Sequence, residues 1–125
     1  MILGIGCDIT EHNIARKFNW DKDTALQHSI FSESELSLSH NNRMIEFLCG
    51  RFAAKEAVAK CLKTGFSDRC SAHEIEILSS ESGVPFIKLS GNTKKFANEI
   101  GVGEWQVSIS HSRDYSISFV IALKK

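Results

Sequence analysis

The stretch from Arg43 to Leu62 constrains the fold most, because it is the longest segment of the chain that can form a helix. It contains no proline and a single glycine, Gly50. Apolar residues recur along it at helical spacing, namely Met44, Phe47, Leu48 and Phe52. Lys63-Thr64-Gly65 follows, and Gly65 is predicted to cap the helix, since glycine adopts the left-handed conformation of a C-cap without strain.

Period-two patterns on both sides of this helix predict strands. Over residues 2–9 one face carries Leu3, Ile5, Cys7 and Ile9, and the other carries Gly4, Gly6 and Asp8. Further strands are predicted over residues 73–78, 86–89, 105–110 and 115–123, with turns at 81–85 and 111–114. The segment from Glu11 to Leu38 is predicted to be helical in pieces, with a capping box at Ser32 and Glu35, and residues 92–100 form another short helix.

These elements predict an α+β fold with a mainly antiparallel sheet packed on one long helix and shorter helices. A length of 125 residues predicts one domain, spanning residues 1–125. Lys plus Arg and Asp plus Glu both number 15, and this balance argues against a general nucleic-acid binder. No apolar run approaches the roughly 20 residues of a membrane span, and no basic flank suggests a signal peptide, so we expect a cytoplasmic protein.

The four cysteines lack the C-x-x-C spacing of a zinc site. Free thiols in a reducing compartment are therefore predicted, buried as small hydrophobic residues. They are Cys7, Cys49, Cys61 and Cys70. The histidines outside the last turn also lack ligand spacing and are predicted to be ordinary surface or core residues: His12, His28, His40 and His73.

Gly4-x-Gly6-x-Asp8 is the first candidate site. Two glycines beside a carboxylate leave room for a bulky neighbour, and a carboxylate near a strand end is a reasonable ligand for a hard metal ion. The alternative is that the glycines only admit a closely packed helix and that Asp8 merely caps it.

The segment from Arg51 to Lys60 is the second candidate site. Glu56 and Lys60 have the spacing of a favourable helix ion pair. Arg51 and Lys55 share that spacing but carry like charge, which is unfavourable unless an anion such as a phosphate lies between them. A solvated charged face is the alternative.

The turn Ser108-Ile109-Ser110-His111-Ser112 is the third candidate site. It places a histidine and several hydroxyl groups at a strand end, where functional loops are common. Ordinary turn chemistry explains the hydroxyl groups equally well.

Three motifs occur in order along the chain: MILGIGCDI, FLCGRFAAKEAVAK and VSISHS. Together they resemble the short bacterial 4′-phosphopantetheinyl transferases, the holo-[acyl-carrier-protein] synthase family. The likeness covers almost the whole chain and implies the family's fold. Each motif alone is weak, but the three in this order and spacing are highly specific.

The resemblance implies transfer of the 4′-phosphopantetheine arm of coenzyme A to a serine of apo acyl carrier protein, in fatty acid biosynthesis. Adenosine 3′,5′-bisphosphate is the other product. The family needs Mg²⁺ and is typically homotrimeric, with active sites between subunits. By motif match, Asp8 and Glu56 bind the metal. The residues placed at coenzyme A are Arg51, Lys55, Lys60, Gly65, Ser110, His111 and Ser112, and the catalytic ones are Glu56, Lys60 and His111.

The sequence departs from the family pattern at several positions. Ala59 replaces a frequent serine, Lys63 stands where a Gly-Thr-Gly turn is usual, and Cys49 replaces a common alanine. An arginine linked to carrier-protein binding usually lies closer to Asp8 than Arg16 does. A patch containing Arg16, Lys17 and Lys22, with Phe18 and Trp20, is the candidate docking surface, and an ordinary amphipathic helix is the alternative.

Two other functions fit the same residues. A metal-dependent phosphohydrolase would use the two carboxylates on a different ester. A non-catalytic module would hold coenzyme A without turnover. Only the transferase needs an acidic protein partner as well as a nucleotide.

Overall fold

The computed structural model describes residues 1–39 and 41–125, so the prediction for His40 lies outside it. The elements in chain order are β1 (Ile2–Glu11), α1 (His12–Lys17), α2 (Thr24–Ile30), α3 (Glu33–Leu36), η1 (Asn41–Arg43), α4 (Met44–Leu62), η2 (Ala72–Glu74), β2 (Ile75–Ser79), β3 (Pro85–Leu89), α5 (Gly91–Glu99), β4 (Val102–His111) and β5 (Tyr115–Lys124). The predicted α+β class and its long helix are confirmed.

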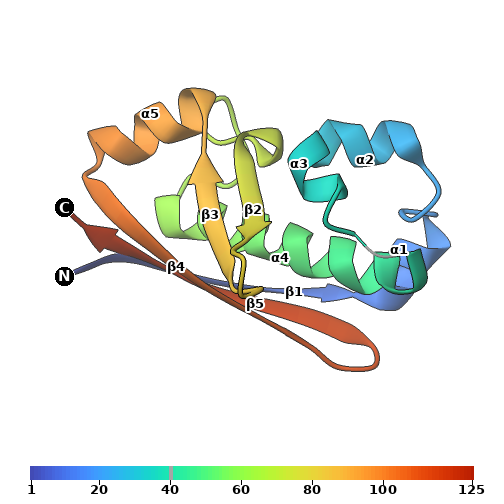
Figure 1. Cartoon of the computed structure of the whole chain (residues 1–125). Coiled ribbons are helices and arrows are strands. Elements are labelled where there is room, and N and C mark those ends of the chain that lie inside the picture. The colour runs from blue at the N-terminus through green and yellow to red at the C-terminus, as the bar shows by residue number, and fades with distance from the viewer. Residues whose placement is uncertain (40) are drawn as a thin grey trace.

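The strands form two antiparallel sheets rather than one. The larger sheet has the order β1-β5-β4, and β2 pairs only with β3. Helix α4 lies along one face of the larger sheet, in contact with β1 and β5 (Figure 1). The β2–β3 hairpin contacts both α4 and β4, while α1 lies at the N-terminal end of α4 and α2 and α3 lie alongside its N-terminal half.

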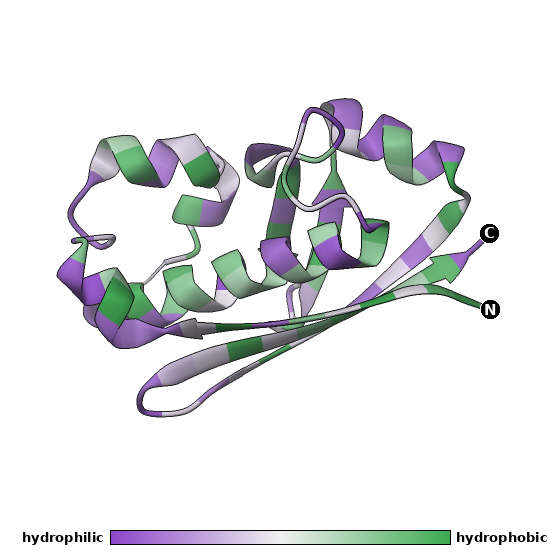
Figure 2. Cartoon of the chain, turned by 180° about the vertical axis from the view of Figure 1, so that it is seen from behind, coloured by the Kyte–Doolittle hydropathy of each residue, from purple (hydrophilic) through white to green (hydrophobic). Residues whose placement is uncertain are grey.

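Helix α4 is the centre of the core, because neighbours cover several of its sides. Its residues Ala54, Ala57, Val58 and Cys61 are buried in one cluster with Ile75, Ile77, Val120 and Ala122 of the strands. Most of α4 is accordingly pale or green in Figure 2, whereas α5 alternates between purple and green sides. None of the helices in the described part of the chain is both long and apolar enough to cross a membrane.

The glycines of β1 allow its backbone to lie directly on α4. A Cβ atom added to Gly6 would overlap the carbonyl oxygen of Ala57, and one added to Gly4 would overlap that of Cys61. The interpretation that these glycines admit a closely packed helix is therefore confirmed. Asp8 lies on the same face of β1, so the close approach also brings its carboxylate to α4.

The opposite face of β1 and β5 is apolar and exposed. Its cross-strand pairs include Ile9 with Ile117 and Cys7 with Phe119, next to Ile5 and Tyr115. Ile9 is 58% exposed and Phe119 is 45% exposed. We call these residues the open sheet face. A contiguous apolar surface of this kind marks an interaction site more often than scattered apolar residues do.

Several local predictions need correction. Helix α4 ends at Leu62 and its left-handed cap is Lys63, at φ 62°, so Gly65 is not the cap. Cys7 is exposed on the open sheet face, whereas the other three cysteines are buried as predicted. Strand β2 begins at Ile75 rather than residue 73, because the 3-10 turn η2 precedes it. The capping box at Ser32 and Glu35 is present as predicted.

We expect Gly6→Ala to destabilise the fold by about 3 kcal/mol or more, because the new methyl group must push β1 off α4. Urea unfolding followed by circular dichroism measures the change. Cys7→Ala is the matched control, since it alters the neighbouring residue on the opposite face. Equal unfolding midpoints for the two variants would contradict the close packing of β1 on α4.

Candidate active site

Asp8, Glu56 and Lys60 meet where β1 passes over the C-terminal half of α4. The Lys60 ammonium donates to Asp8 Oδ1 at 3.0 Å and to the Cys7 carbonyl at 2.9 Å. Helical side chains lean toward the helix N-terminus, so Lys60 reaches back to the turn that carries Glu56. The sequence predicted a pair between Glu56 and Lys60, but the ion pair that forms joins Lys60 to Asp8 across two elements.

Burial raises the pKa of Glu56, and the nearby Asp8 carboxylate raises it further, while Lys60 lowers it. Two carboxylates that repel each other in this way are suited to hold a cation or a proton between them. The Lys60 ammonium now supplies the positive charge beside Asp8.

This donor set fits a magnesium ion. Mg²⁺ commonly binds one or two carboxylates and completes its shell with water and substrate phosphate oxygens. No cluster of three or more His, Cys, Asp or Glu side chains suited to a metal occurs among residues 1–39 and 41–125. A transition metal held wholly by protein ligands is therefore a poorer match than a hard cation shared with a phosphorylated substrate.

Lys55 lies on another side of α4 and is fully buried, with 0% of its side chain exposed. Its ammonium donates to Glu35 Oε1 at 2.8 Å, to the Ala72 carbonyl at 2.8 Å and to the Ile75 carbonyl. The prediction that Lys55 faces a coenzyme A phosphate is therefore wrong, because every direction from its ammonium is taken by the protein.

The anion expected near Arg51 and Lys55 exists, but it belongs to the protein. Glu35 pairs with Lys55, and its charge also raises the pKa of Arg51, which burial lowers more strongly. Arg51 itself is half-buried, donates to Ser79 Oγ at 2.7 Å and stacks over the ring of Phe47. The like-charge spacing of Arg51 and Lys55 therefore correctly predicted a nearby anion, but that anion is the Glu35 carboxylate and not a phosphate.

His111 lies on the sheet face that meets α4, nearer the start of the helix. Its ring packs against Gly50, where a Cβ atom would collide with ring carbon Cε1. His111 Nδ1 lies 2.7 Å from Ser116 Oγ and 3.9 Å from Glu46 Oε1. Burial lowers the pKa of His111, and Glu46 opposes that shift.

Within one chain the predicted site residues therefore form two clusters. Gly50, beneath His111, precedes Glu56 by six residues, or about 9 Å along the helix axis. Ser110 and Ser112 are exposed, and Ser112 Oγ accepts from the Tyr115 amide at 3.2 Å, as ordinary turn chemistry predicts. Gly65 has φ 59° and open space around its Cα.

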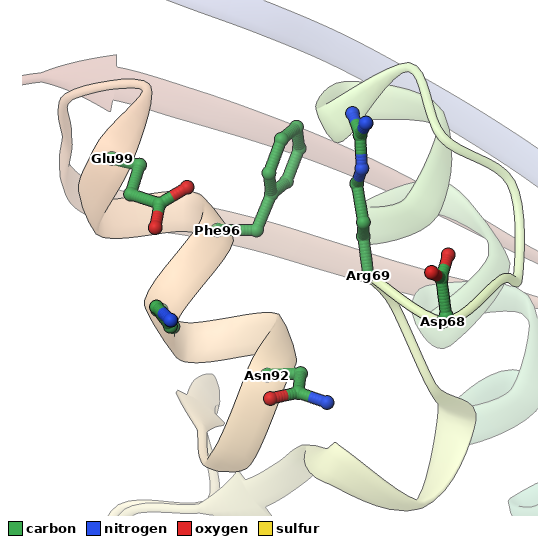
Figure 3. A pocket seen from close by; sticks show the side chains of 6 residues that line it. Asp68, Arg69, Asn92, Phe96 and Glu99 are labelled. Atoms are coloured by element: carbon green, nitrogen blue, oxygen red, sulfur yellow. The ribbon is translucent and has the colours of Figure 1, made fainter.

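One pocket, of about 380 Å³, contains none of the predicted site residues. It lies between α5 and the segment after α4, and its lining residues are Asp68, Arg69, Asn92, Lys95, Phe96 and Glu99 (Figure 3). Two cations and two anions share the wall, and the Arg69 guanidinium lies 5.4 Å from the centre of the Phe96 ring. The balanced charge gives this pocket no preference for a phosphate.

Some residues of the candidate docking patch are exposed, as a docking surface requires, whereas Trp20 packs against the protein, as the amphipathic-helix alternative predicts. Phe18 is 60% exposed, with the Lys17 ammonium 5.8 Å from its ring centre. Arg16 is exposed and donates to Asn13 Oδ1 at 2.9 Å. Trp20 instead packs edge-on against Phe52, with ring centres 5.3 Å apart.

Three buried polar residues escaped the sequence analysis. Glu35 was noticed only as a helix cap, although it also holds Lys55. His12 and Ser116 are 104 positions apart in the chain and bond at 2.8 Å beneath His111. A polar residue at an inward strand position was the available signal for Ser116, but nothing local indicated its partners.

Comparison with known proteins gives one consistent result. A sequence model described as the 4′-phosphopantetheinyl transferase superfamily matches residues 4–120. The holo-[acyl-carrier-protein] synthase of Clostridium novyi (strain NT) is 38% identical over 122 residues, which are 97% of this chain and 87% of that protein.

Solved structures of the same description are also similar. The holo-[acyl-carrier-protein] synthase of Neisseria meningitidis superposes with a TM-score of 0.88 at 30% identity, covering 99% of this chain and 100% of that one. The Helicobacter pylori synthase, solved in complex with coenzyme A, gives 0.83 at 28% identity, covering 95% and 99%.

Lys55→Met should lower the free energy of unfolding by about 3–5 kcal/mol, because it leaves the buried Glu35 carboxylate without its cation. Chemical denaturation measures the loss. Lys94→Met, which removes an exposed cation from α5, is the control and should change stability little. A Lys55→Met protein as stable as wild type would show that the buried pair contributes nothing.

Proposed function

The chain belongs to the 4′-phosphopantetheinyl transferase superfamily, and we propose that it transfers the 4′-phosphopantetheine group of coenzyme A to a serine of apo acyl carrier protein. The products are holo acyl carrier protein and adenosine 3′,5′-bisphosphate. The observation that carries this proposal is the meeting of Asp8, Glu56 and Lys60, an anionic pair beside a cation. Such an arrangement suits substitution at a pyrophosphate, where positioning and charge neutralisation supply most of the catalysis.

The chemistry assigned to each side chain follows from its charge and surroundings. The carrier serine attacks the phosphorus that bears the pantetheine arm, and the bond to the nucleotide phosphate breaks. Glu56 accepts the serine proton, directly or through a water molecule that it orients. Lys60, whose side chain is about half exposed, neutralises the charge that develops on the leaving phosphate.

Asp8 and Glu56 are the residues we assign to Mg²⁺. When bound, the ion would neutralise the pyrophosphate oxygens and so supply electrostatic stabilisation. The two carboxylates come from separate elements, and the close approach of β1 to α4 holds them together. Binding would also relieve the repulsion between them.

The remaining contacts to coenzyme A stay predictions for Arg51, Gly65, Ser110, His111 and Ser112. Arg51 is half-buried, so only part of its guanidinium can reach a phosphate. Lys55 is withdrawn from this group because of its burial.

Carrier docking on Arg16, Lys17 and Lys22 also stays a prediction, supported by the exposure of Phe18 beside them. Acyl carrier proteins are acidic, so a positive patch would accelerate their association. The salt dependence of the KM for the carrier protein, measured in an Arg16→Glu/Lys17→Glu variant, tests this docking surface.

We further propose a homotrimer with active sites between subunits. The open sheet face supplies an apolar surface for association. A pocket of about 250 Å³ at the edge of this face, beside the last turn, is lined by Ile9, Ser110, His111, Ser112, Tyr115 and Ile117. A second subunit packed there would meet the residues of the last turn, and the two site clusters of different chains would then lie together. We expect the enzyme to act in the cytoplasm.

Asp8→Ala and Glu56→Gln should each abolish transfer while leaving the fold intact. Apo carrier protein, coenzyme A and Mg²⁺ are incubated with each variant, and the carrier is weighed by mass spectrometry. Without Mg²⁺, Glu56→Gln should unfold at or above the wild-type temperature at pH 7. The reason is that a carboxyl with a raised pKa destabilises the fold once ionised, and glutamine removes that charge. Added Mg²⁺ should raise the wild-type temperature but not that of the variant.

Mass spectrometry of coenzyme A as well as of the carrier also separates the alternative functions. A phosphohydrolase would cleave coenzyme A without a mass gain on the carrier, and a binding module would leave both unchanged. Near-normal transfer by either carboxylate variant at ordinary Mg²⁺ would overturn the metal assignment.

Phe119→Glu should dissociate the oligomer, because it places a charge on the apolar contact surface. Sedimentation velocity measures the change, and Val84→Glu, on the exposed β2–β3 turn, is the control. Inactive Asp8→Ala and His111→Ala proteins, co-refolded in equal amounts, should regain about a quarter of wild-type activity if subunits mix at random and share sites. A fully active monomer would refute the shared site.

A further inference from the structure

A hydrogen-bonded chain of three side chains lies beneath the last turn of the larger sheet. His12 begins α1, Ser116 is on β5, and His111 ends β4. Ser116 Oγ lies 2.8 Å from His12 Nε2 and 2.7 Å from His111 Nδ1, so one hydroxyl group bridges two imidazole rings. Neither His12 nor Ser116 has a role in the function described above.

The outer end of this chain is anchored to the backbone. His12 Nδ1 lies 3.1 Å from the carbonyl oxygen of Arg113. A carbonyl oxygen only accepts, so Nδ1 of His12 carries a proton. The ring is 2% exposed and forms no ion pair with a carboxylate within the described ranges, and a buried unpaired charge is costly, so the geometry favours the neutral ring. Its Nε2 is then an acceptor.

The single proton of Ser116 must consequently point to His12. The only other acceptor recorded for it in the described chain, the Glu46 carbonyl, is 3.4 Å away and competes poorly. Toward His111, Ser116 can then only accept. His111 Nδ1 must carry a proton, and the neutral ring leaves Nε2 unprotonated.

We propose that His12 and Ser116 are positioning residues that hold neutral His111 in its Nδ1–H form, with Nε2 free as a proton acceptor. No group in residues 1–39 or 41–125 forms a hydrogen bond with Nε2, and the side chain keeps 30% of its surface exposed. His111 also lines a pocket of about 220 Å³ with Arg43, Glu46 and Phe47. A phosphate oxygen at Nε2 can be held only after that nitrogen gains a proton.

The consequence rests on the proposed function: coenzyme A binding through His111 depends on protonation of the ring. The charged or titratable groups that face this ring are Glu46 and Arg51 from α4, Arg43 from η1, His12 from α1 and Tyr115 from β5. Burial lowers the pKa of His111 more than any of these charges changes it. As pH rises through that pKa, the donor at Nε2 is lost.

Nitrogen-15 NMR of histidine side chains tests the positioning role directly, because long-range proton correlations distinguish the two tautomers. Spectra of the full chain are assigned with His12→Asn and His111→Asn variants. In wild type above the pKa of His111, both rings should be in the Nδ1–H form. In Ser116→Ala the His111 signal should shift to the Nε2–H form, and Ser116→Thr, which keeps the hydroxyl group, should restore it.

Ser118→Ala is the matched control. Ser118 is also fully buried on β5 and faces α4, but its hydroxyl has no hydrogen-bond partner in the described chain. This variant should leave the His111 tautomer unchanged. An Nε2–H form of His111 in wild type would overturn the proposal, even if Ser116→Ala failed to fold.

Kinetics supply the second readout. Wild-type kcat/KM for coenzyme A should fall roughly tenfold across the His111 titration, the size of one hydrogen bond to a charged group. In Ser116→Ala the fall should shrink to about twofold, since the neutral Nε2–H ring can still donate. An unchanged profile would overturn the link to binding. A wild-type enzyme that does not modify the carrier would refute the proposed function, while the NMR result would still decide the tautomer.

Discussion

The contact between the β1 backbone and helix α4 is the constraint on which the rest of the structure depends. Gly4 and Gly6 remove the side chains that would hold the two elements apart. The strand can then lie directly on the helix, and Asp8, two residues further along the same face, reaches Glu56 and Lys60. Packing and site geometry therefore share one cause, and a change that widens this contact would disturb both.

The buried pair of Lys55 and Glu35 performs a different task on another side of α4. It joins the short helix α3, the turn η2 and strand β2 to the long helix through charged hydrogen bonds. Glu35 also accepts from the Ser32 amide, so the capping box and the ion pair share one carboxylate. A buried charge without its partner costs several kcal/mol, and this pair consequently fixes where the helical segment sits.

The two site clusters lie apart within one chain, and the proposed oligomer would bring clusters of different chains together. The acidic cluster lies beneath β1, whereas His111 lies near the start of α4, next to the open sheet face. Association through that face would bring the last turn of one subunit to its neighbour, and it would cover apolar side chains that now contact solvent. The proposed oligomer would thus account for two separate observations, the exposed apolar residues and the separation of the two site clusters.

The amino-acid sequence determined the elements and most of the acidic site. Period-two and helical patterns, together with the Ser32–Glu35 capping box, are local signals, so the strands and the long helix were predictable. The paired glycines and Asp8 were recognisable on one strand face for the same reason. The family resemblance added the assignment of Asp8, Glu56 and Lys60 to one reaction.

Only the tertiary structure decided which charged residue meets which. Lys55 and Lys60 are on the same helix and look equivalent in sequence. Lys55 is nevertheless buried and paired with Glu35, whereas Lys60 is partly exposed and paired with Asp8. The bond between His12 and Ser116 likewise joins the start of α1 to the β4–β5 hairpin, 104 positions away in the chain. Such contacts depend on how distant elements pack, and no local pattern in the sequence records that packing.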